Sequence, residues 1–171
     1  LIKQIWFRGC FLLVVIKMNS QLLKINQNII LYDDTLISEV DENLFDLEFW
    51  ANDKETRLIN KGRGKVLLIN CQGLPSVLKH YYRGGLVSNF LSEKYLWQGE
   101  SNARSIKEFR ILQKMLQAGL PVPRPIAARV NRQGIFYTAD LLVLKNSSIS
   151  IWLFYNLYFF FFVFHDFYRY V

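Results

Sequence analysis

One amphipathic segment, Asn102 to Ala118, constrains the fold more than any other part of this sequence. Its apolar side chains recur at spacings of three and four residues, the period of a helix with one buried face. These side chains are Ile106, Phe109, Leu112, Met115 and Leu116. Ser101 or Asn102 can cap the start of the helix, and Gly119 can end it. We therefore expect one main helix here.

Short strand-like runs stand on both sides of this helix. They are Val66–Ile69 and Ser76–His80 before it, and Ile126–Val130 and Ile135–Ala139 after it. Turn signals at 71–75 and 131–134 separate the members of each pair. The connector at 120–125 is rich in proline, which biases each preceding residue away from helix. The predicted order is hairpin, helix, hairpin, and the fold class is α+β.

The beginning of the chain differs from this middle region. Residues 5–16 are largely apolar and precede Met18, the first methionine. Arg8 interrupts the apolar run and no small-residue cleavage site follows, which disfavours a signal peptide. We interpret residues 1–17 as a non-native or upstream extension, and we expect the domain proper to begin at residue 18.

Residues 143–171 form an aromatic tail, in which twelve of the last twenty residues are aromatic. Asn146 to Phe164 contains no charged residue and is long enough to cross a bilayer. Four consecutive phenylalanines and scattered Tyr, Asn and Ser are not typical of a membrane span. Three interpretations remain open: a frameshifted or readthrough sequence, a membrane anchor, and an aromatic core strand.

Charge and cysteine content narrow the classes of partner. The net charge of +7 favours an anionic partner, such as nucleotide phosphates, an acidic membrane surface or nucleic acid. No RNA- or DNA-binding motif surrounds the basic and aromatic run Tyr81-Tyr82-Arg83, so we expect no nucleic-acid partner. Cys10 and Cys71 form no CxxC motif and have no partner histidines, so neither a metal site nor a disulfide framework is indicated.

The chemistry-bearing residues lie in the middle of the chain. Gly62 and Gly64 flank an arginine in Lys61–Lys65, where backbone amides could approach an anion, although a plain basic turn has the same sequence. Lys79 stands on a predicted strand about fifteen residues later and could reach phosphate, or it could be an ordinary surface lysine. Glu108 lies beside the apolar stripe of the helix. It could meet Lys79, or pair locally with Arg104 or Lys107.

Three runs carry a resemblance to a known family. They are HYYRGGLVSNFLSEKYLW (His80–Trp97), ARSIKEFRILQKMLQAGLPVPRPIAARV (Ala103–Val130) and YTADLL (Tyr137–Leu142). With Phe45-Asp46 and Phe49-Trp50, they make residues 18–142 resemble the amino-terminal lobe of the 3-deoxy-D-manno-octulosonic acid (Kdo) kinases. These are lipopolysaccharide core kinases with a protein-kinase-like fold, whose small lobe is an antiparallel sheet with one main helix.

The resemblance implies a role for each candidate residue. Gly62 and Gly64 match the glycine turn over the nucleotide phosphates, Lys79 the basic strand residue, and Glu108 the helix glutamate that orients it. The run Arg83-Gly84-Gly85 matches a family-typical segment, for which phosphate or acidic-sugar contact is one hypothesis.

The activity implied by the resemblance is transfer of the ATP γ-phosphate, with Mg²⁺, to the 4-hydroxyl of Kdo in Kdo-lipid IVA. The Kdo-bearing lipid A precursor and an anionic inner-membrane surface would be partners, at the cytoplasmic face as a peripheral protein. Kinases supply a catalytic-loop Asp and metal ligands beyond the small lobe. No such loop follows Leu142 in this sequence, so no catalytic residue is assigned and we expect an inactive fragment. The alternative function is a small basic membrane-anchored binding protein without catalysis.

Overall fold

The computed structural model describes residues 2–7, 10–15, 18–53, 56–61, 64–82 and 94–145. For 2–7, 10–15, 60–61 and 64–65 it describes the backbone alone. The aromatic tail expected at 143–171 lies outside the described residues from position 146 onward.

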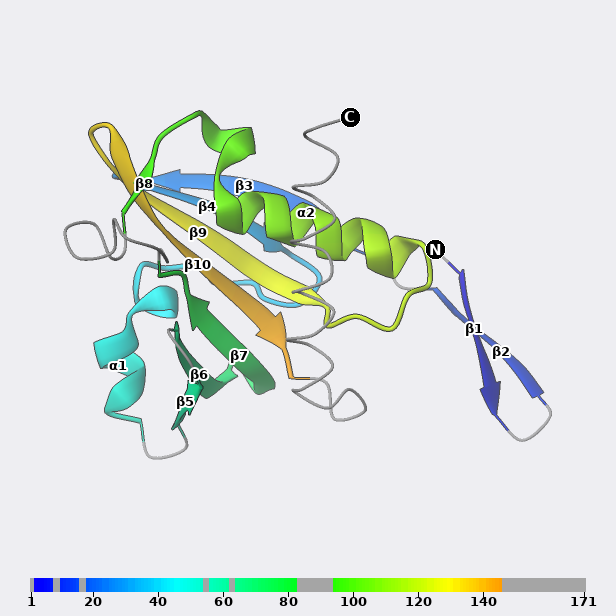
Figure 1. The fold of residues 1–171 in the computed structure, drawn as a ribbon. Helices are drawn as coiled ribbons and strands as arrows, with labels where there is room; N and C mark the ends of the chain where they lie inside the picture. Colours follow the sequence, from blue (N-terminus) through cyan, green and yellow to red (C-terminus); the bar gives the residue numbers. More distant parts are fainter. Residues whose placement is uncertain are drawn as a thin grey trace.

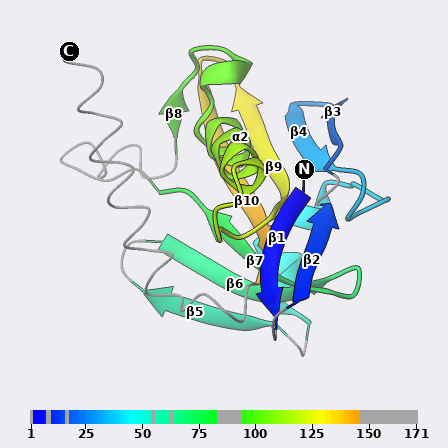
Figure 2. The same ribbon diagram turned by 90° about the vertical axis from the view of Figure 1, so that its right-hand side faces the viewer.

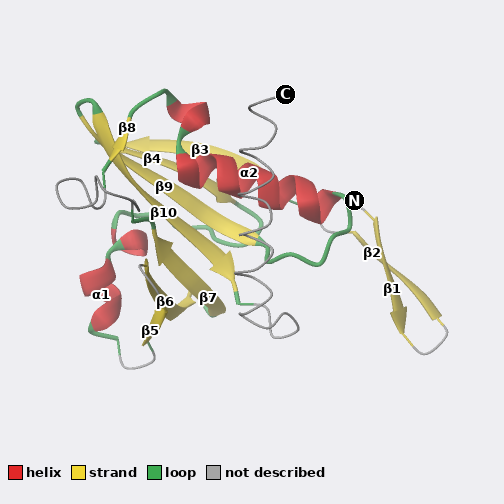
Figure 3. Ribbon diagram, in the orientation of Figure 1, coloured by secondary structure: helices red, strands yellow, loops and turns green. Residues whose placement is uncertain are grey.

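Strands make up most of the described chain, with one long helix (Figures 1 and 3). The strands are β1 (Ile2–Phe7), β2 (Cys10–Val15), β3 (Ser20–Ile25), β4 (Asn28–Asp33), β5 (Arg57–Lys61), β6 (Gly64–Cys71), β7 (Leu74–His80), β8 (Tyr95–Leu96), β9 (Pro125–Gln133) and β10 (Phe136–Leu144). The helical elements are η1 (Asn43–Phe45), α1 (Leu47–Ala51), η3 (Glu100–Asn102) and α2 (Arg104–Gln117).

Eight of these strands form one antiparallel sheet in the order β3-β4-β9-β10-β7-β6-β5, with β8 pairing to β10. The strands β1 and β2 pair with each other in a separate two-stranded sheet. The predicted α+β class and its small-lobe arrangement, an antiparallel sheet with one main helix, are confirmed.

The helix α2 begins two residues later than the predicted start. Its N-cap is Ala103, which offers no side-chain cap, so the prediction that Ser101 or Asn102 caps it was wrong. The Asn102 amide donates instead to the Gln98 carbonyl, 2.9 Å away, within the preceding turn. At the other end Gly119 has φ +79°, and Leu120 N donates to Met115 O. This is the left-handed glycine stop that the sequence indicated.

Both predicted hairpins are present, with longer strands than their apolar runs suggested. β6 and β7 are joined by a tight turn in which Gln72 and Gly73 both have positive φ. This backbone matches the twist of paired strands, and Gly adopts it freely. The turn between β9 and β10 lies at Gly134 and Ile135 rather than across 131–134. The hairpin β3–β4, which precedes them in the chain, was not predicted from the sequence.

The sheet is covered on both faces, and each face has its own hydrophobic core. Figure 2 shows α2 end-on above β9 and β10. The buried residues on that side are Leu31, Tyr81, Ala103, Ile106, Phe109, Leu112, Leu116, Val122, Ala128, Val130, Tyr137, Ala139, Leu141 and Val143. Those on the other side are Ile30, Ile37, Leu44, Phe45, Leu67, Ile69, Cys71, Leu78, Ile126, Ala127 and Leu142. The second core lies beneath the segment that connects β4 to β5 and includes η1 and α1.

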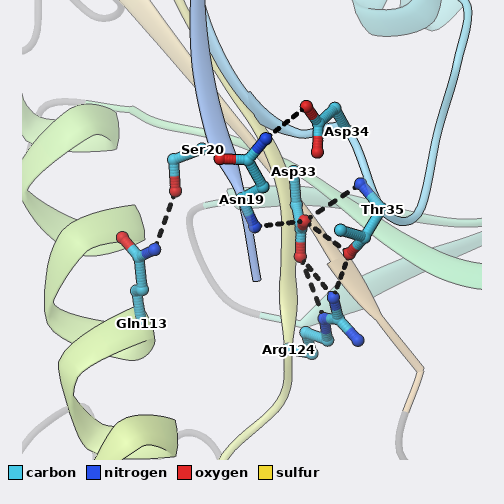
Figure 4. A network of polar contacts seen from close by, with 7 residues as sticks. All are labelled: Asn19, Ser20, Asp33, Asp34, Thr35, Gln113 and Arg124. Carbon is cyan, nitrogen blue, oxygen red and sulfur yellow. Dashed lines mark hydrogen bonds and ion pairs between the residues drawn. The ribbon is translucent and has the colours of Figure 1, made fainter. Parts of the chain in front are cut away.

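A buried ion pair fastens the β3–β4 hairpin to the connector that follows α2 (Figure 4). Asp33, at the end of β4, is fully buried. Its Oδ2 accepts from Arg124 Nε at 3.0 Å and Nη2 at 2.6 Å. Its Oδ1 accepts from Asn19 N and from the Thr35 hydroxyl, at 3.2 and 2.7 Å. Both carboxylate oxygens are therefore satisfied, as a buried charge requires.

A second polar contact in Figure 4 joins the helix itself to the same hairpin. Gln113 Nε2, on α2, donates to Ser20 Oγ on β3 at 2.7 Å. The helix is thus held to the amino-terminal hairpin by its own side chain as well as through the connector.

Cys71 gives a test of the second core. Its side chain is 1% exposed, and burial, together with the charge of Asp41, raises the pKa of its thiol from 9.0 to about 11. In a Cys10→Ser variant we expect slow disulfide exchange with a colorimetric reagent at pH 9 and fast exchange after unfolding in denaturant. The thiol pKa is higher when folded, so its contribution to stability is intact below pH 9 and declines as pH rises toward 11. Equal reaction rates in the folded and unfolded protein would contradict this burial.

Candidate functional site

Lys79 and Glu108 meet between the sheet and the helix, as the sequence predicted. Lys79 is the sixth of the seven residues of β7, and strand alternation turns Val77, Lys79 and Tyr81 to the face that α2 covers. Glu108 lies in the second turn of α2. Lys79 Nζ donates to Glu108 Oε1 at 3.3 Å, across a separation of 29 residues. This contact is confirmed; its role in nucleotide binding stays a prediction.

The pair is partly shielded from water. The Lys79 and Glu108 side chains are 25% and 11% exposed. Burial lowers the pKa of Lys79 below its ordinary value, the negative charge of Glu108 opposes that change, and the nearby Arg104 adds to the lowering. A cation held in this way remains reachable from solvent while its direction is fixed by the carboxylate.

Tyrosines and a second cation surround this pair. Lys79 Nζ lies 4.5 Å from the centre of the Tyr81 ring, and Arg104 Cζ lies 5.0 Å from it. Tyr95 and Tyr137 stack with ring centres 5.4 Å apart. Both hydroxyls accept hydrogen bonds from Arg104. The backbone N–H of Arg104 donates to the Tyr137 hydroxyl at 3.2 Å, and its Nη1 donates to the Tyr95 hydroxyl at 3.4 Å. Two cations, Lys79 and Arg104, therefore stand close to the Glu108 carboxylate and the Tyr81 ring.

Burial also raises the pKa values of two of these phenols. The pKa of Tyr81 lies well above its ordinary value because of burial, and the Glu108 charge adds to the rise. The pKa of Tyr137 is raised by burial as well. Both phenols stay neutral at physiological pH.

The first residues of β6, at the end of the predicted glycine turn in the sequence, lie near Lys79 in the sheet. Gly62 lies outside the described residues, and Gly64 is the first residue of β6. Lys61 pairs with Gly64 at the end of the β5–β6 hairpin, and Val66, two residues further, pairs with Lys79. The end of this hairpin and the lysine therefore lie at the same end of neighbouring strands. The predicted contacts at Arg83, Gly84 and Gly85 lie outside the described residues.

A buried polar cluster on the opposite face was missed by the sequence reasoning. His80 Nδ1 lies 2.6 Å from Asp140 Oδ1, and Arg129 Nε donates to Asp140 Oδ2 at 2.9 Å. Arg129 also donates to the Phe45 carbonyl at 3.3 Å and lies over the Phe45 ring. No carboxylate lies within four residues of His80 in the sequence. Its partner stands 60 residues away and is brought opposite by the β7–β10 register.

The part of the chain that the structure describes carries neither a metal-binding cluster nor a membrane-spanning helix. Within it, no group of three or more His, Cys, Asp or Glu side chains could hold a metal ion. No helix described there is long and apolar enough to cross a membrane. The expected Mg²⁺ is therefore not assigned to any of these residues.

Comparison with known proteins identifies one family. Residues 47–149 match the family described as "Lipopolysaccharide kinase (Kdo/WaaP) family". This range includes β5 to β10 and α2, and with them Lys79 and Glu108. No solved structure is significantly similar to the chain.

Curated relatives are 35–38% identical to this chain over the residues that align. A protein of Vibrio parahaemolyticus serotype O3:K6 is 35% identical over 117 residues, covering 68% of this chain and 49% of the relative. A Vibrio vulnificus (strain CMCP6) protein is 38% identical, with shares of 68% and 49%. One from Stenotrophomonas maltophilia (strain K279a) is 38% identical, with shares of 67% and 45%. All three are named 3-deoxy-D-manno-octulosonic acid kinase, and the chain spans about half of their length.

The Asp140 cluster predicts a large effect on stability. Asp140→Ala removes a fully buried carboxylate and leaves the Arg129 guanidinium, 15% exposed, without that acceptor. We expect the free energy of unfolding in urea to fall by about 3–5 kcal/mol. Glu39→Ala, at an exposed carboxylate, should change it by less than about 0.5 kcal/mol. A loss at Asp140 no larger than at Glu39 would contradict the cluster's structural role.

Proposed function

Since the chain belongs to the lipopolysaccharide kinase (Kdo/WaaP) family, we propose that residues 18–142 are the nucleotide-binding small lobe of a Kdo kinase. The reaction of the whole protein would transfer the ATP γ-phosphate to the 4-hydroxyl of Kdo in Kdo-lipid IVA, during lipopolysaccharide core biosynthesis. The lobe's part in that reaction is to bind and orient the nucleotide.

The single observation that carries this proposal is the Lys79–Glu108 contact. Kinases require an ion pair between a strand lysine and a helix glutamate, because the lysine then points at the nucleotide phosphates. Here a strand of the sheet and the main helix supply the same two residue types, in contact at 3.3 Å. Lysine and glutamate side chains are mostly exposed in folded proteins, whereas here both are largely shielded and paired across 29 residues.

Position within the sheet supports the glycine turn as the second part of the site. Gly64 starts the strand that pairs with β7, and Gly62 stands within the preceding turn sequence. Backbone N–H groups of a glycine-rich turn can approach phosphate oxygens closely, because no Cβ intervenes. The ammonium of Lys79 and this turn would then bind one polyphosphate from two neighbouring strands. Arg83, Gly84 and Gly85 are proposed as a further phosphate or sugar contact.

The transfer step itself needs more than this lobe. A carboxylate must orient the attacking hydroxyl, and metal-binding groups must neutralise the charge that develops on the phosphoryl oxygens. No His and Asp followed by an Asn with catalytic-loop spacing stands after Leu142 in this sequence. We therefore propose that the 171-residue chain binds nucleotide without transferring phosphate.

The proposed location is the cytoplasmic face of the inner membrane, where the lipid substrate would be reached peripherally. The net charge of +7 supports attraction to an anionic surface. A second candidate is a membrane-anchored binding protein without catalysis, which the uncharged run Asn146 to Phe164 favours. Carbonate extraction of membranes separates the two, because an anchored protein stays with the bilayer and a peripheral one is released.

Lys79 gives the direct test of nucleotide binding. Lys79→Met removes the ammonium and keeps most of the stem's volume, so we expect the affinity for ATP by calorimetry to fall about 10- to 100-fold. Lys107→Met, at an exposed position of α2, should change the affinity less than about threefold. Equal losses in the two variants would show that only general charge attraction is being measured.

Turnover gives a separate test of the inactive-fragment proposal. With ATP, Mg²⁺ and Kdo-lipid IVA, we expect the chain to give no phosphorylated lipid above background in mass spectrometry. The full-length Vibrio parahaemolyticus relative, assayed in parallel, establishes that the assay detects product. Clear phosphorylation by the 171-residue chain would overturn the proposal, whatever the result of the binding measurement.

A further inference from the structure

Tyr81 occupies an unusual place beside the Lys79–Glu108 pair. It directly follows β7, and its backbone N–H donates to the Ala139 carbonyl on β10 at 3.1 Å. Its side chain is 2% exposed and packs in the core beneath α2. The ring is therefore held by both the backbone and the surrounding core, and it can serve as a fixed surface for its neighbours.

The neighbours of this ring are charged. The Lys79 ammonium lies 4.5 Å from the ring centre, and the Arg104 guanidinium, from the first turn of α2, lies 5.0 Å from it. A cation within about 6 Å of a ring centre is attracted by the negative face of the ring, and more strongly where water is excluded. Both contacts fall within that range, at a ring that is almost fully buried.

A cation–π contact suits a phosphate-binding lysine for two reasons. The four-carbon stem of a lysine has many rotamers, and each ordered contact reduces the number that must be lost on binding. The ring attracts the ammonium without occupying an N–H donor, and the ammonium has three such donors. A second carboxylate at the same place would consume a donor and neutralise the charge that phosphate needs.

We propose that Tyr81 is a positioning residue, whose ring holds the Lys79 ammonium in the direction that receives a nucleotide phosphate. The Glu108 carboxylate contacts the ammonium from one side, and the face of the Tyr81 ring contacts it from another. The inference rests on the proposed function for the identity of the ligand. The contact between ring and ammonium stands independently of it.

A fluorinated series at position 81 isolates the ring's electrostatics from its shape. Tyr81→Phe should keep ATP affinity within about threefold, because the ring face is retained. Replacing that phenylalanine by its mono-, di- and trifluorinated forms withdraws charge from the ring face at nearly constant volume. We expect ATP affinity by calorimetry to fall stepwise, by about three- to tenfold in total. In a Lys79→Met background the same series should leave affinity nearly constant.

Several outcomes would overturn the inference. A flat series in the Lys79 protein would show that the ring does not act through its charge distribution. An equal slope in both backgrounds would show that Tyr81 acts without Lys79, as a purely structural residue would. A large loss in Tyr81→Phe alone would assign the role to the hydroxyl instead.

Urea unfolding of the same variants separates this inference from the proposed function. If the Lys79 protein binds no ATP, the proposed function fails. The ring contact is then judged from stability alone. We expect each fluorine to lower the free energy of unfolding, because it weakens the attraction between the ring and its cations. The decrease should be steeper with Lys79 than with methionine at position 79, where the Arg104 contact with the ring remains but the Lys79 contact is lost. Equal slopes in the two backgrounds would show that the contact between Lys79 and the ring contributes nothing to stability.

Discussion

The pairing of β10 with β7 is the interaction on which the rest of the structure depends. It joins a half-sheet of β3, β4 and β9 to one of β6 and β5, and α2 stands in the chain between the two paired strands. The register sets Asp140 opposite His80 and Leu141 opposite Lys79. Because successive side chains alternate between faces, a shift of one residue would move Lys79 away from α2 and His80 toward it.

The two faces of this strand pair have different chemistry. On the α2 side, the Lys79 and Glu108 side chains are partly shielded but still reached by solvent, and they stand beside the buried Tyr81 ring. On the other side, Asp140 is fully buried between His80 and Arg129, and Phe45 lies against the guanidinium. A buried ion pair seldom adds net stability over an apolar core, but breaking one is costly. This cluster therefore penalises alternative registers, which supports the arrangement on the first face.

Local sequence patterns predicted the helix and the turns better than they predicted which distant residues contact each other. The helical period of Ile106, Phe109 and Leu112 and the turn at Gly73 are contained within a few residues, so the sequence reveals them directly. The contact of Lys79 with Glu108 was expected from the family resemblance, while the position of Glu108 beside the apolar stripe also allowed local pairing with Arg104 or Lys107. The pairing of His80 with Asp140 depends on strand register over 60 residues, for which no local signal exists. The N-cap of α2 was misplaced because Asn102 bonds within the preceding turn instead.

The clamp between Asp33 and Arg124 has a consequence for motion. Two hydrogen bonds also join α2 to the sheet, one from Gln113 Nε2 to Ser20 Oγ and one from Ser105 Oγ to the Arg129 carbonyl at 2.8 Å. With the ion pair, they fasten α2 near both ends to strands of one sheet. A swing of the helix as a rigid body would have to separate a fully buried carboxylate from its guanidinium. These contacts oppose any displacement of α2 from the sheet, and with it any separation of Glu108 from Lys79. The fold therefore favours a lysine–glutamate contact that is already formed before a ligand binds.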